Sequence, residues 1–195
     1  DPSPYTAHGV LMGIKASCHE KFGSDSLKGL RVAVQGLGNV GFNLVKYLES
    51  EGAKIIVSDI DPDKIKKVKD LYPNIQTVGP TEILSVECDV LAPCAMGAIV
   101  NEKTIGHFKT PIICGGANNQ LHELRHGNAL EELGILYAPD YIVNAGGLMN
   151  VFVELEGYSQ SRAFDKTKRV YDNLKNVYKI SKRDKIPTYL AADRL

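Results

Sequence analysis

Apolar residues along the chain recur with two alternating periods, which predicts short buried strands separated by helices. The first residues are typical of a helix start, because Ser3 can serve as an N-cap and Pro4 fits the first helical turn. Apolar positions three or four residues apart predict helices over residues 3–22, 39–51, 63–71, 121–133 and 147–183, and a short last helix capped by Thr188. Runs rich in β-branched residues predict strands over residues 30–34, 54–58, 75–78, 90–92, 112–114, 135–137 and 141–143.

This alternation predicts an α/β fold: a doubly wound, mostly parallel sheet of the Rossmann type with flanking N- and C-terminal helices. The 195 residues suit one domain, so we expect residues 1–195 to fold as a single unit. Hydrophobic residues make up 44% and charged residues 24% of the chain, which is ordinary for a globular domain and argues against a disordered one.

Charge and cysteine content narrow the classes of partner. Lys and Arg total 23, as do Asp and Glu, and a net charge of zero argues against a bulk nucleic-acid or membrane-surface binder. The sequence has no apolar run of about 18 residues and no secretory signal at its start. Cys18, Cys88, Cys94 and Cys114 lack metal-site spacing, so we expect no metal, and reduced, mostly buried thiols in a cytoplasmic protein.

A glycine motif carries the strongest chemical signal. Gly36, Gly38 and Gly41 form a G-x-G-x-x-G that directly follows the strand over 30–34 and opens the helix over 39–51. The first glycine permits a tight turn, the second lets the backbone approach a pyrophosphate, and the third lets helix and strand pack closely. Asn39 and Val40 supply backbone N–H groups at the helix start, where phosphates bind. We therefore expect a dinucleotide-binding domain.

Asp59 indicates which dinucleotide is bound. It ends the second strand, about 20 residues beyond Gly38, where an acid binds the adenosine ribose hydroxyls. A carboxylate there also repels the 2′-phosphate of NADP, so we expect NAD, although the nearby lysines leave room for dual specificity. The alternative is a helix cap, since Asp59 and Asp61 both precede a helix.

Three further loops fall where a doubly wound sheet places ligands, beyond the carboxyl ends of strands. They span residues 92–97, 115–120 and 143–147, and they contain small residues and asparagines. Small residues let a flat ring or ribose approach, and amides offer paired donors and acceptors. Such loops are often only turns, but together with the glycine motif they predict a nicotinamide-side pocket.

The chain resembles the glutamate/leucine/phenylalanine/valine dehydrogenases. The resemblance covers the whole chain and rests on the motifs D-P-S-P-Y-T-A, G-L-G-N-V-G, A-P-C-A, G-A-N-N-Q and A-P-D-Y-I-V-N-A-G-G. It is closest to the leucine-specific members, with the phenylalanine-specific ones next. It implies reversible oxidative deamination of a branched-chain L-amino acid to its 2-oxo acid and ammonia, with NAD taking the hydride.

The same resemblance suggests roles for individual residues. It implies that Thr6 and Asn118 contact the nicotinamide carboxamide or its ribose, and that Ala95 and Asn144 line the same side of the pocket. It also implies that Leu148 and Val151 shape the pocket for the substrate side chain, and ordinary core packing is the alternative for these two.

Two departures from the family pattern matter. The family carries catalytic lysines and a catalytic aspartate upstream of the D-P-S-P motif, and no lysine of this sequence has a comparable glycine-rich context. We therefore expect residues 1–195 to be the dinucleotide-binding half, with no catalytic residue of its own and a homo-oligomeric full-length enzyme. Phe152 and Val153 stand where smaller or acidic residues are expected, which weakens the substrate-pocket assignment.

Two other functions stay open at this point. A stand-alone module could bind NAD without catalysis, and the coding sequence upstream of Asp1 would distinguish it from half of an enzyme. A different dehydrogenase could also use the same fold, since fold alone does not fix function.

Overall fold

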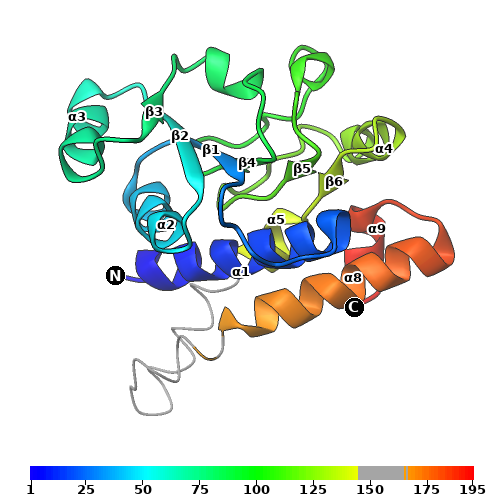
Figure 1. Cartoon of the computed structure of the whole chain (residues 1–195). Coiled ribbons are helices and arrows are strands. Elements are labelled where there is room, and N and C mark those ends of the chain that lie inside the picture. The colour runs from blue at the N-terminus through cyan, green and yellow to red at the C-terminus, as the bar shows by residue number, and fades with distance from the viewer. Residues whose placement is uncertain (145–164, 166) are drawn as a thin grey trace.

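The computed structural model describes residues 1–144, 165 and 167–195 of the chain, and its centre is a six-stranded parallel sheet (Figure 1). The strands are β1 (Arg31–Gln35), β2 (Lys54–Ser58), β3 (Gln76–Thr77), β4 (Val90–Pro93), β5 (Ile112–Ile113) and β6 (Leu136–Tyr137). Their order across the sheet is β3-β2-β1-β4-β5-β6. The chain thus winds outward from β1 in one direction and then outward from β4 in the other, which confirms the doubly wound α/β fold.

Helices connect the strands and cover the sheet. They are α1 (Ser3–Phe22), α2 (Asn39–Ser50), α3 (Pro62–Leu71), α4 (Arg125–Glu132), α5 (Asp140–Val143), α8 (Arg169–Asp184) and α9 (Thr188–Ala192), with short 3₁₀ turns η1 (Glu82–Leu84) and η2 (Ile105–His107). Helix α1 packs against both α2 and α8, and the long α1 and α8 run alongside each other beneath the sheet in Figure 1. No described helix is long and apolar enough to cross a bilayer.

The sheet divides the core into two parts because successive side chains of a strand point to opposite faces. Val32 and Val34 of β1 belong to the cluster that includes α1, α2 and α8. Ala33, between them, belongs to the cluster on the other face, together with Ile83 of η1 and Leu130 of α4. Burial on both faces explains why these strands read as continuous apolar runs.

Three local predictions are wrong. Thr188 is not the cap of α9: Pro187 holds the cap position, and the Thr188 hydroxyl donates to the Tyr137 carbonyl at 2.6 Å. The strand expected over 141–143 is part of α5, where the N–H groups of Ile142 and Val143 both donate to the carbonyl of Pro139. A proline followed by an aspartate starts a helical turn there, and this outweighs the β-propensity of the short apolar run. Ser3 is not the cap of α1: Pro2 holds the cap position without a side-chain hydrogen bond, and Ser3 donates its N–H to Asp1 Oδ1 at 3.0 Å.

Other boundaries shift. The helix expected over 121–133 begins only at Arg125, because Leu121 forms a parallel bridge with Val100. The described part of the helix expected over 147–183 is α8, and the rest lies outside the described residues.

The four cysteines are free, as expected. Cys18, Cys88 and Cys114 are buried and Cys94 is partly buried.

Candidate functional site

The candidate site lies at the carboxyl ends of β1 and β4, where the strand order reverses and doubly wound sheets bind their ligands. The loops that follow these two strands touch. A Cβ built on Gly36 would lie 2.6 Å from the Cβ of Ala95, so only glycine lets the two loops approach this closely. The glycine loop, predicted to hold the pyrophosphate, therefore meets the loop predicted to line the nicotinamide side of the pocket.

The glycine loop has the backbone conformation that the sequence motif predicts. Gly36 has a φ of +93°, a left-handed conformation that residues with a side chain rarely adopt, and its N–H donates to the Ser58 carbonyl at 2.7 Å. Gly38 caps α2 in an extended conformation with no side-chain cap, and a Cβ there would meet nothing within 4 Å. The first N–H groups of α2, from Asn39 to Gly41, are thus left to a ligand, as in anion sites at helix starts.

Asp59 binds the glycine loop from the end of β2. Its Oδ2 accepts the N–H of Leu37 at 2.6 Å, and its Oδ1 accepts the N–H of Asp61 at 2.8 Å. The Nζ of Lys64 lies 4.0 Å from the same Oδ1, and only 7% of the Asp59 side chain is exposed. The helix cap that was the alternative role for Asp59 is provided by Asp61, which caps α3 by accepting the N–H of Asp63.

A cavity of about 260 Å³ opens between this loop and the loop after β4. It is lined by Gln35, Gly36, Gly38, Ser58, Asp59, Ile60, Lys64, Pro80, Ala95 and Met96. Gln35 and Ser58 are direct neighbours across β1 and β2 at its floor. Gln35 Oε1 and Ser58 Oγ are buried and have no hydrogen-bond partner among the described residues. Because buried polar atoms normally have a partner, this cavity suits a polar ligand such as a ribose or a base.

A second cavity of about 410 Å³ lies beside the first, with Gly38 and Lys64 common to both. Its other lining residues are Leu37, Asn39, Phe42, Asn43 and Lys67. Gly38, the glycine expected to lie closest to a pyrophosphate, therefore borders both cavities. The open space beside Gly38 and the start of α2 suits the phosphates of a dinucleotide.

On the nicotinamide side, the loops after β4 and β5 are joined through backbone contacts. The N–H of Ala117 donates to the Pro93 carbonyl at 2.9 Å, and a Cβ on Gly115 would overlap the same carbonyl. The buried Gln120 amide donates to the carbonyls of Gly115 and Ala117, both at 2.9 Å. These contacts fix the shape of the second loop.

Two of the predicted nicotinamide residues are brought together. Asn144 Nδ2 donates to Asn118 Oδ1, so the loop after β5 is tied to the end of α5. Thr6 is not part of this contact: it lies near the start of α1, and its hydroxyl donates to the Pro2 carbonyl at 3.3 Å. It lies one helical turn before Val10, whose side chain packs beside Gly116. Leu148 and Val151, predicted for the substrate pocket, lie outside the described residues.

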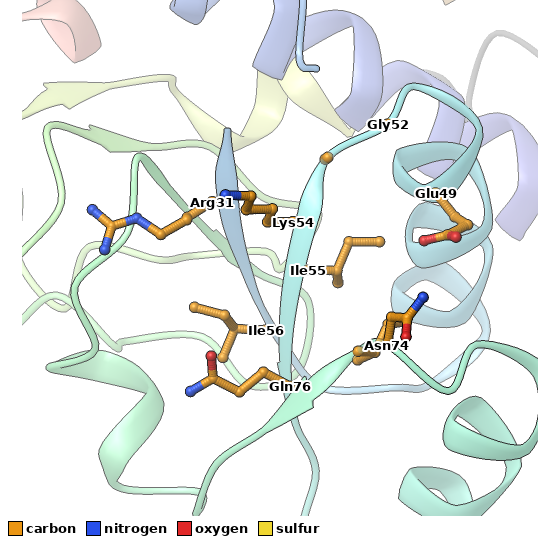
Figure 2. A pocket seen from close by; sticks show the side chains of 10 residues that line it. Arg31, Glu49, Gly52, Lys54, Ile55, Ile56, Asn74 and Gln76 are labelled. Carbon is orange, nitrogen blue, oxygen red and sulfur yellow. The ribbon is translucent and has the colours of Figure 1, made fainter. Parts of the chain in front are cut away.

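A further cavity, of about 460 Å³, is elsewhere. Figure 2 shows it around the amino ends of β1, β2 and β3, with Arg31, Lys54 and Gln76 among its lining residues. Arg31 is engaged with Asp89 and Glu87, each at 3.9 Å. This is the edge of the sheet opposite the glycine loop, where doubly wound folds do not bind their ligands.

The thiol nearest the crevice is no candidate nucleophile. Cys94 directly follows β4, and burial raises its pKa to about 11, so it stays protonated near neutral pH. Within the described part of the chain no group of three metal-ligating side chains is found.

The sequence reasoning missed Gln35 and Ser58 as site residues. The available signal was their position: each is a polar residue at the end of an otherwise apolar buried strand. Gln120 was noted only as part of a loop, because nothing local reveals which carbonyls its amide reaches.

Comparison with known proteins agrees with this geometry. A sequence profile of the Glutamate/Leucine/Phenylalanine/Valine dehydrogenases matches residues 3–63 and 57–187. The chain belongs to this dehydrogenase family. All 195 residues align with a leucine dehydrogenase of Geobacillus stearothermophilus at 51% identity, covering 53% of that protein. A phenylalanine dehydrogenase of Lysinibacillus sphaericus is 45% identical over 198 residues, covering 52% of it.

A solved member has the same architecture. The crystal structure of L-tryptophan dehydrogenase from Nostoc punctiforme matches the whole chain with a TM-score of 0.96 and 45% identity, and 59% of that structure is covered. The chain thus spans about half the length of the relatives it matches. Family membership and similarity to leucine dehydrogenase were both expected from the sequence motifs, and both are confirmed.

Proposed function

We propose that this chain is the NAD-binding part of an enzyme that reversibly deaminates a branched-chain L-amino acid, leucine in particular, to its 2-oxo acid and ammonia. The observation that carries the proposal is the glycine loop tied to Asp59 at the switch point of the sheet, beside a cavity with unpartnered buried polar atoms. The 51% identity to a leucine dehydrogenase supports the choice of reaction and substrate.

The described residues would bind and orient the cofactor. The N–H groups at the start of α2 would hold the pyrophosphate, with Gly38 leaving room for it, and Asp59 would accept hydrogen bonds from the adenosine ribose. The linked amides of Asn118 and Asn144 offer donors and acceptors to a carboxamide. When bound, NAD supplies the hydride acceptor for oxidation of the amino acid.

Substrate selection is proposed to rest in part on Leu148 and Val151. Both are apolar, so a pocket that they line would leave a glutamate side-chain carboxylate without a partner, which disfavours that substrate. Phenylalanine is the main alternative substrate, because an aromatic side chain also lacks charge. Comparing kcat/KM for leucine, phenylalanine and glutamate tests this choice in a protein with the full length of the family. Preference for leucine supports the proposal, and preference for either competitor overturns the choice of substrate.

The proposal extends to the rest of the protein. We infer that residues 1–195 form one dinucleotide-binding domain, that the acid–base lysines are contributed by a region beyond this sequence, and that the whole enzyme is a cytoplasmic homo-oligomer. A non-catalytic NAD-binding module is the second candidate, since the roles proposed for the described residues are all in cofactor binding. An upstream coding sequence with a lysine-bearing, glycine-rich segment favours the enzyme, and its absence favours the module.

Calorimetric titration of the 195-residue polypeptide with NAD is the direct test. We expect saturable 1:1 binding, and no NADH formation when leucine is added, because the lysines that the family uses for acid–base chemistry have no counterpart in this sequence. Absence of NAD binding would overturn the proposed function. Leucine-dependent NADH formation by this polypeptide alone would overturn its assignment as the non-catalytic half.

A further inference from the structure

Two hydrogen bonds join the loop after β5 to α5. The backbone N–H of Gln120 donates to Oδ2 of Asp140, the first residue of α5, at 3.1 Å. Asn144, which directly follows α5, donates its Nδ2 to Asn118 Oδ1. The loop is thus connected to both ends of this helical turn. Two separate links fix the orientation of one segment against another, whereas a single link still allows rotation.

The Gln120 side chain fixes the backbone shape of this loop. It is fully buried, and its Nε2 donates to the carbonyls of Gly115 and Ala117, both at 2.9 Å. The Gln120 carbonyl accepts the N–H of Val100 at 3.0 Å, which ties the end of the loop to a neighbouring segment. Both N–H donors of the side-chain amide are therefore used to close the loop on itself.

The Asp140 carboxylate holds the start of α5 against the loop. Its Oδ1 accepts the N–H of Tyr141 at 2.9 Å, while its Oδ2 accepts the N–H of Gln120. Hydrogen bonds to an ionised carboxylate are roughly twice as strong as those between neutral groups. One carboxylate is therefore shared by the last residue of the loop and the first turn of α5, so that the two segments are held together at this end.

The side chains of Asn118 and Asn144, which we call the amide pair, have the chemistry of a carboxamide site. Asn118 is exposed, so packing does not orient its side chain. Because Asn118 Oδ1 accepts from Asn144 Nδ2, the pair keeps Asn118 Nδ2 as a donor and Asn144 Oδ1 as an acceptor for a ligand. A primary carboxamide offers the complementary set, since its oxygen accepts and its nitrogen donates. The match holds only while the two side chains keep this relative position.

We propose that Gln120 and Asp140 are positioning residues that hold the amide pair in the arrangement that binds the nicotinamide carboxamide. The inference rests on the proposed function, because it presumes that the crevice binds NAD. Gln120 acts through the backbone that carries Asn118, and Asp140 acts through the helical turn that leads to Asn144. Neither of them touches the cofactor. Hydride transfer requires a defined orientation of the nicotinamide ring, and a carboxamide held at one edge fixes the rotation of that ring.

Calorimetric titrations of the 195-residue chain with three ligands test the proposal. NAD occupies the whole crevice, ADP-ribose lacks the nicotinamide, and the acetylpyridine analogue of NAD has a methyl group in place of the carboxamide nitrogen. The parent chain is expected to bind NAD about threefold or more tighter than the acetylpyridine analogue, because the analogue cannot donate to Asn144 Oδ1. Equal affinity for these two ligands would refute the carboxamide match on which the positioning role depends.

Gln120→Met is close to glutamine in length and volume and removes both amide donors. It should weaken NAD binding by about tenfold, abolish the preference over the acetylpyridine analogue, and change ADP-ribose binding by less than about threefold. Asp140→Ala should have the same selective effect through α5. Asp140→Asn keeps one side-chain oxygen that can accept the Gln120 N–H, so its NAD affinity should lie between those of the parent and of Asp140→Ala.

Thr188→Val is the matched control. The buried Thr188 hydroxyl donates to the Tyr137 carbonyl at 2.6 Å, so this variant also removes a buried hydrogen bond but leaves the loop after β5 and α5 unaltered. Thermal unfolding should show a loss of stability, while the affinities for all three ligands stay at the parent values. A loss of NAD affinity equal to that of Gln120→Met would show that general loosening of the fold accounts for the effect, and would refute the positioning role.

The outcomes separate the two proposals. If the parent chain binds neither NAD nor ADP-ribose, the proposed function fails. If it binds both, and the variants weaken the two ligands equally or leave NAD binding unchanged, the proposed function stands and the positioning role is refuted. Where Gln120→Met or Asp140→Ala does not unfold cooperatively, the milder Asp140→Asn carries the same comparison: a loss confined to NAD supports the role, and an equal loss for ADP-ribose overturns it.

Discussion

The carbonyl oxygen of Gly36 fills the space that a side chain on Gly41 would need. A Cβ built on Gly41 would fall well inside 3.0 Å of that oxygen, a separation that real Cβ atoms essentially never show. The first turn of α2 therefore rests directly on the glycine loop, and the first and last glycines of the motif are coupled through packing. This contact fixes the start of α2 against the glycine loop.

Gly41→Ala should therefore destabilise the fold. The atom that blocks the methyl group belongs to the backbone, so α2 must move away from β1, and overpacking of this kind typically costs about 1–3 kcal/mol. Urea unfolding should show a lower midpoint than in the parent chain, and NAD binding should weaken as the loop shifts. A midpoint equal to that of the parent would show that the close approach is dispensable.

Gly38→Ala should separate binding from stability. Gly38 has an extended backbone that alanine can adopt, and a Cβ there would meet nothing within 4 Å. The variant should unfold at the parent's urea midpoint, within about 0.5 kcal/mol. The methyl group would instead occupy the space proposed for the pyrophosphate, so NAD affinity should fall by about tenfold or more. Unchanged affinity would contradict the phosphate assignment.

The sequence predicted the parts of this site that depend on local order along the chain. Gly36, Gly38 and Asp59 could be recognised because a strand, a turn and a helix follow one another in a fixed pattern. The second role of Asp59 could not be predicted, since its bond to the Leu37 N–H depends on how two neighbouring strands end together.

The contact between Asn118 and Asn144 could be predicted only in part from the sequence. Both residues were assigned to one side of the pocket by family resemblance, but their hydrogen bond depends on α5, which the sequence predicted as a strand. The Ser58 hydroxyl, which has no partner in the described part of the chain, has no sequence signal beyond its place at a strand end. Tertiary packing decides which polar atoms have partners, and local patterns carry no information about it.

Asp59→Ser should affect both the loop and cofactor choice. The N–H groups of Leu37 and Asp61 would lose their acceptors, which costs about 1–3 kcal/mol for each group left buried and unpaired. NAD binding should weaken by about tenfold or more, and the ratio of NAD to NADP affinity should move toward NADP. Calorimetry with both dinucleotides measures the ratio, and an unchanged ratio would refute the ribose assignment.

Asp61→Ala is the control for that variant. It removes the cap of α3, which typically costs about 0.5–2 kcal/mol, but Asp61 lines neither cavity. Thermal unfolding should therefore register a loss of stability, while the NAD to NADP ratio stays at the parent value. A shift in the ratio would show that loosening α3 alone changes cofactor choice.

The buried thiols predict a loss of stability at alkaline pH. Burial raises the pKa of Cys88 and of Cys94 to about 11 and that of Cys18 to about 12, against 9.0 for an unperturbed thiol. Below pH 9.0 the thiols are protonated in both states and the stability is fully present. As the pH rises above that value, the unfolded chain loses protons that the folded chain keeps, so unfolding becomes more favourable until the folded thiols ionise as well.

Cys18→Ala provides the measurement. Each thiol that ionises only in the unfolded state lowers the free energy of unfolding by about 1.4 kcal/mol per pH unit once the pH exceeds its unfolded pKa. Alanine has a high helix propensity, so the variant should lose little of the helical stability of α1. Urea unfolding between about pH 8 and about pH 10 should give a steep decline for the parent and a shallower one for the variant, by about 1 kcal/mol per unit above pH 9. Equal slopes would mean that Cys18 ionises at the same pH in both states and that burial in α1 does not protect its proton.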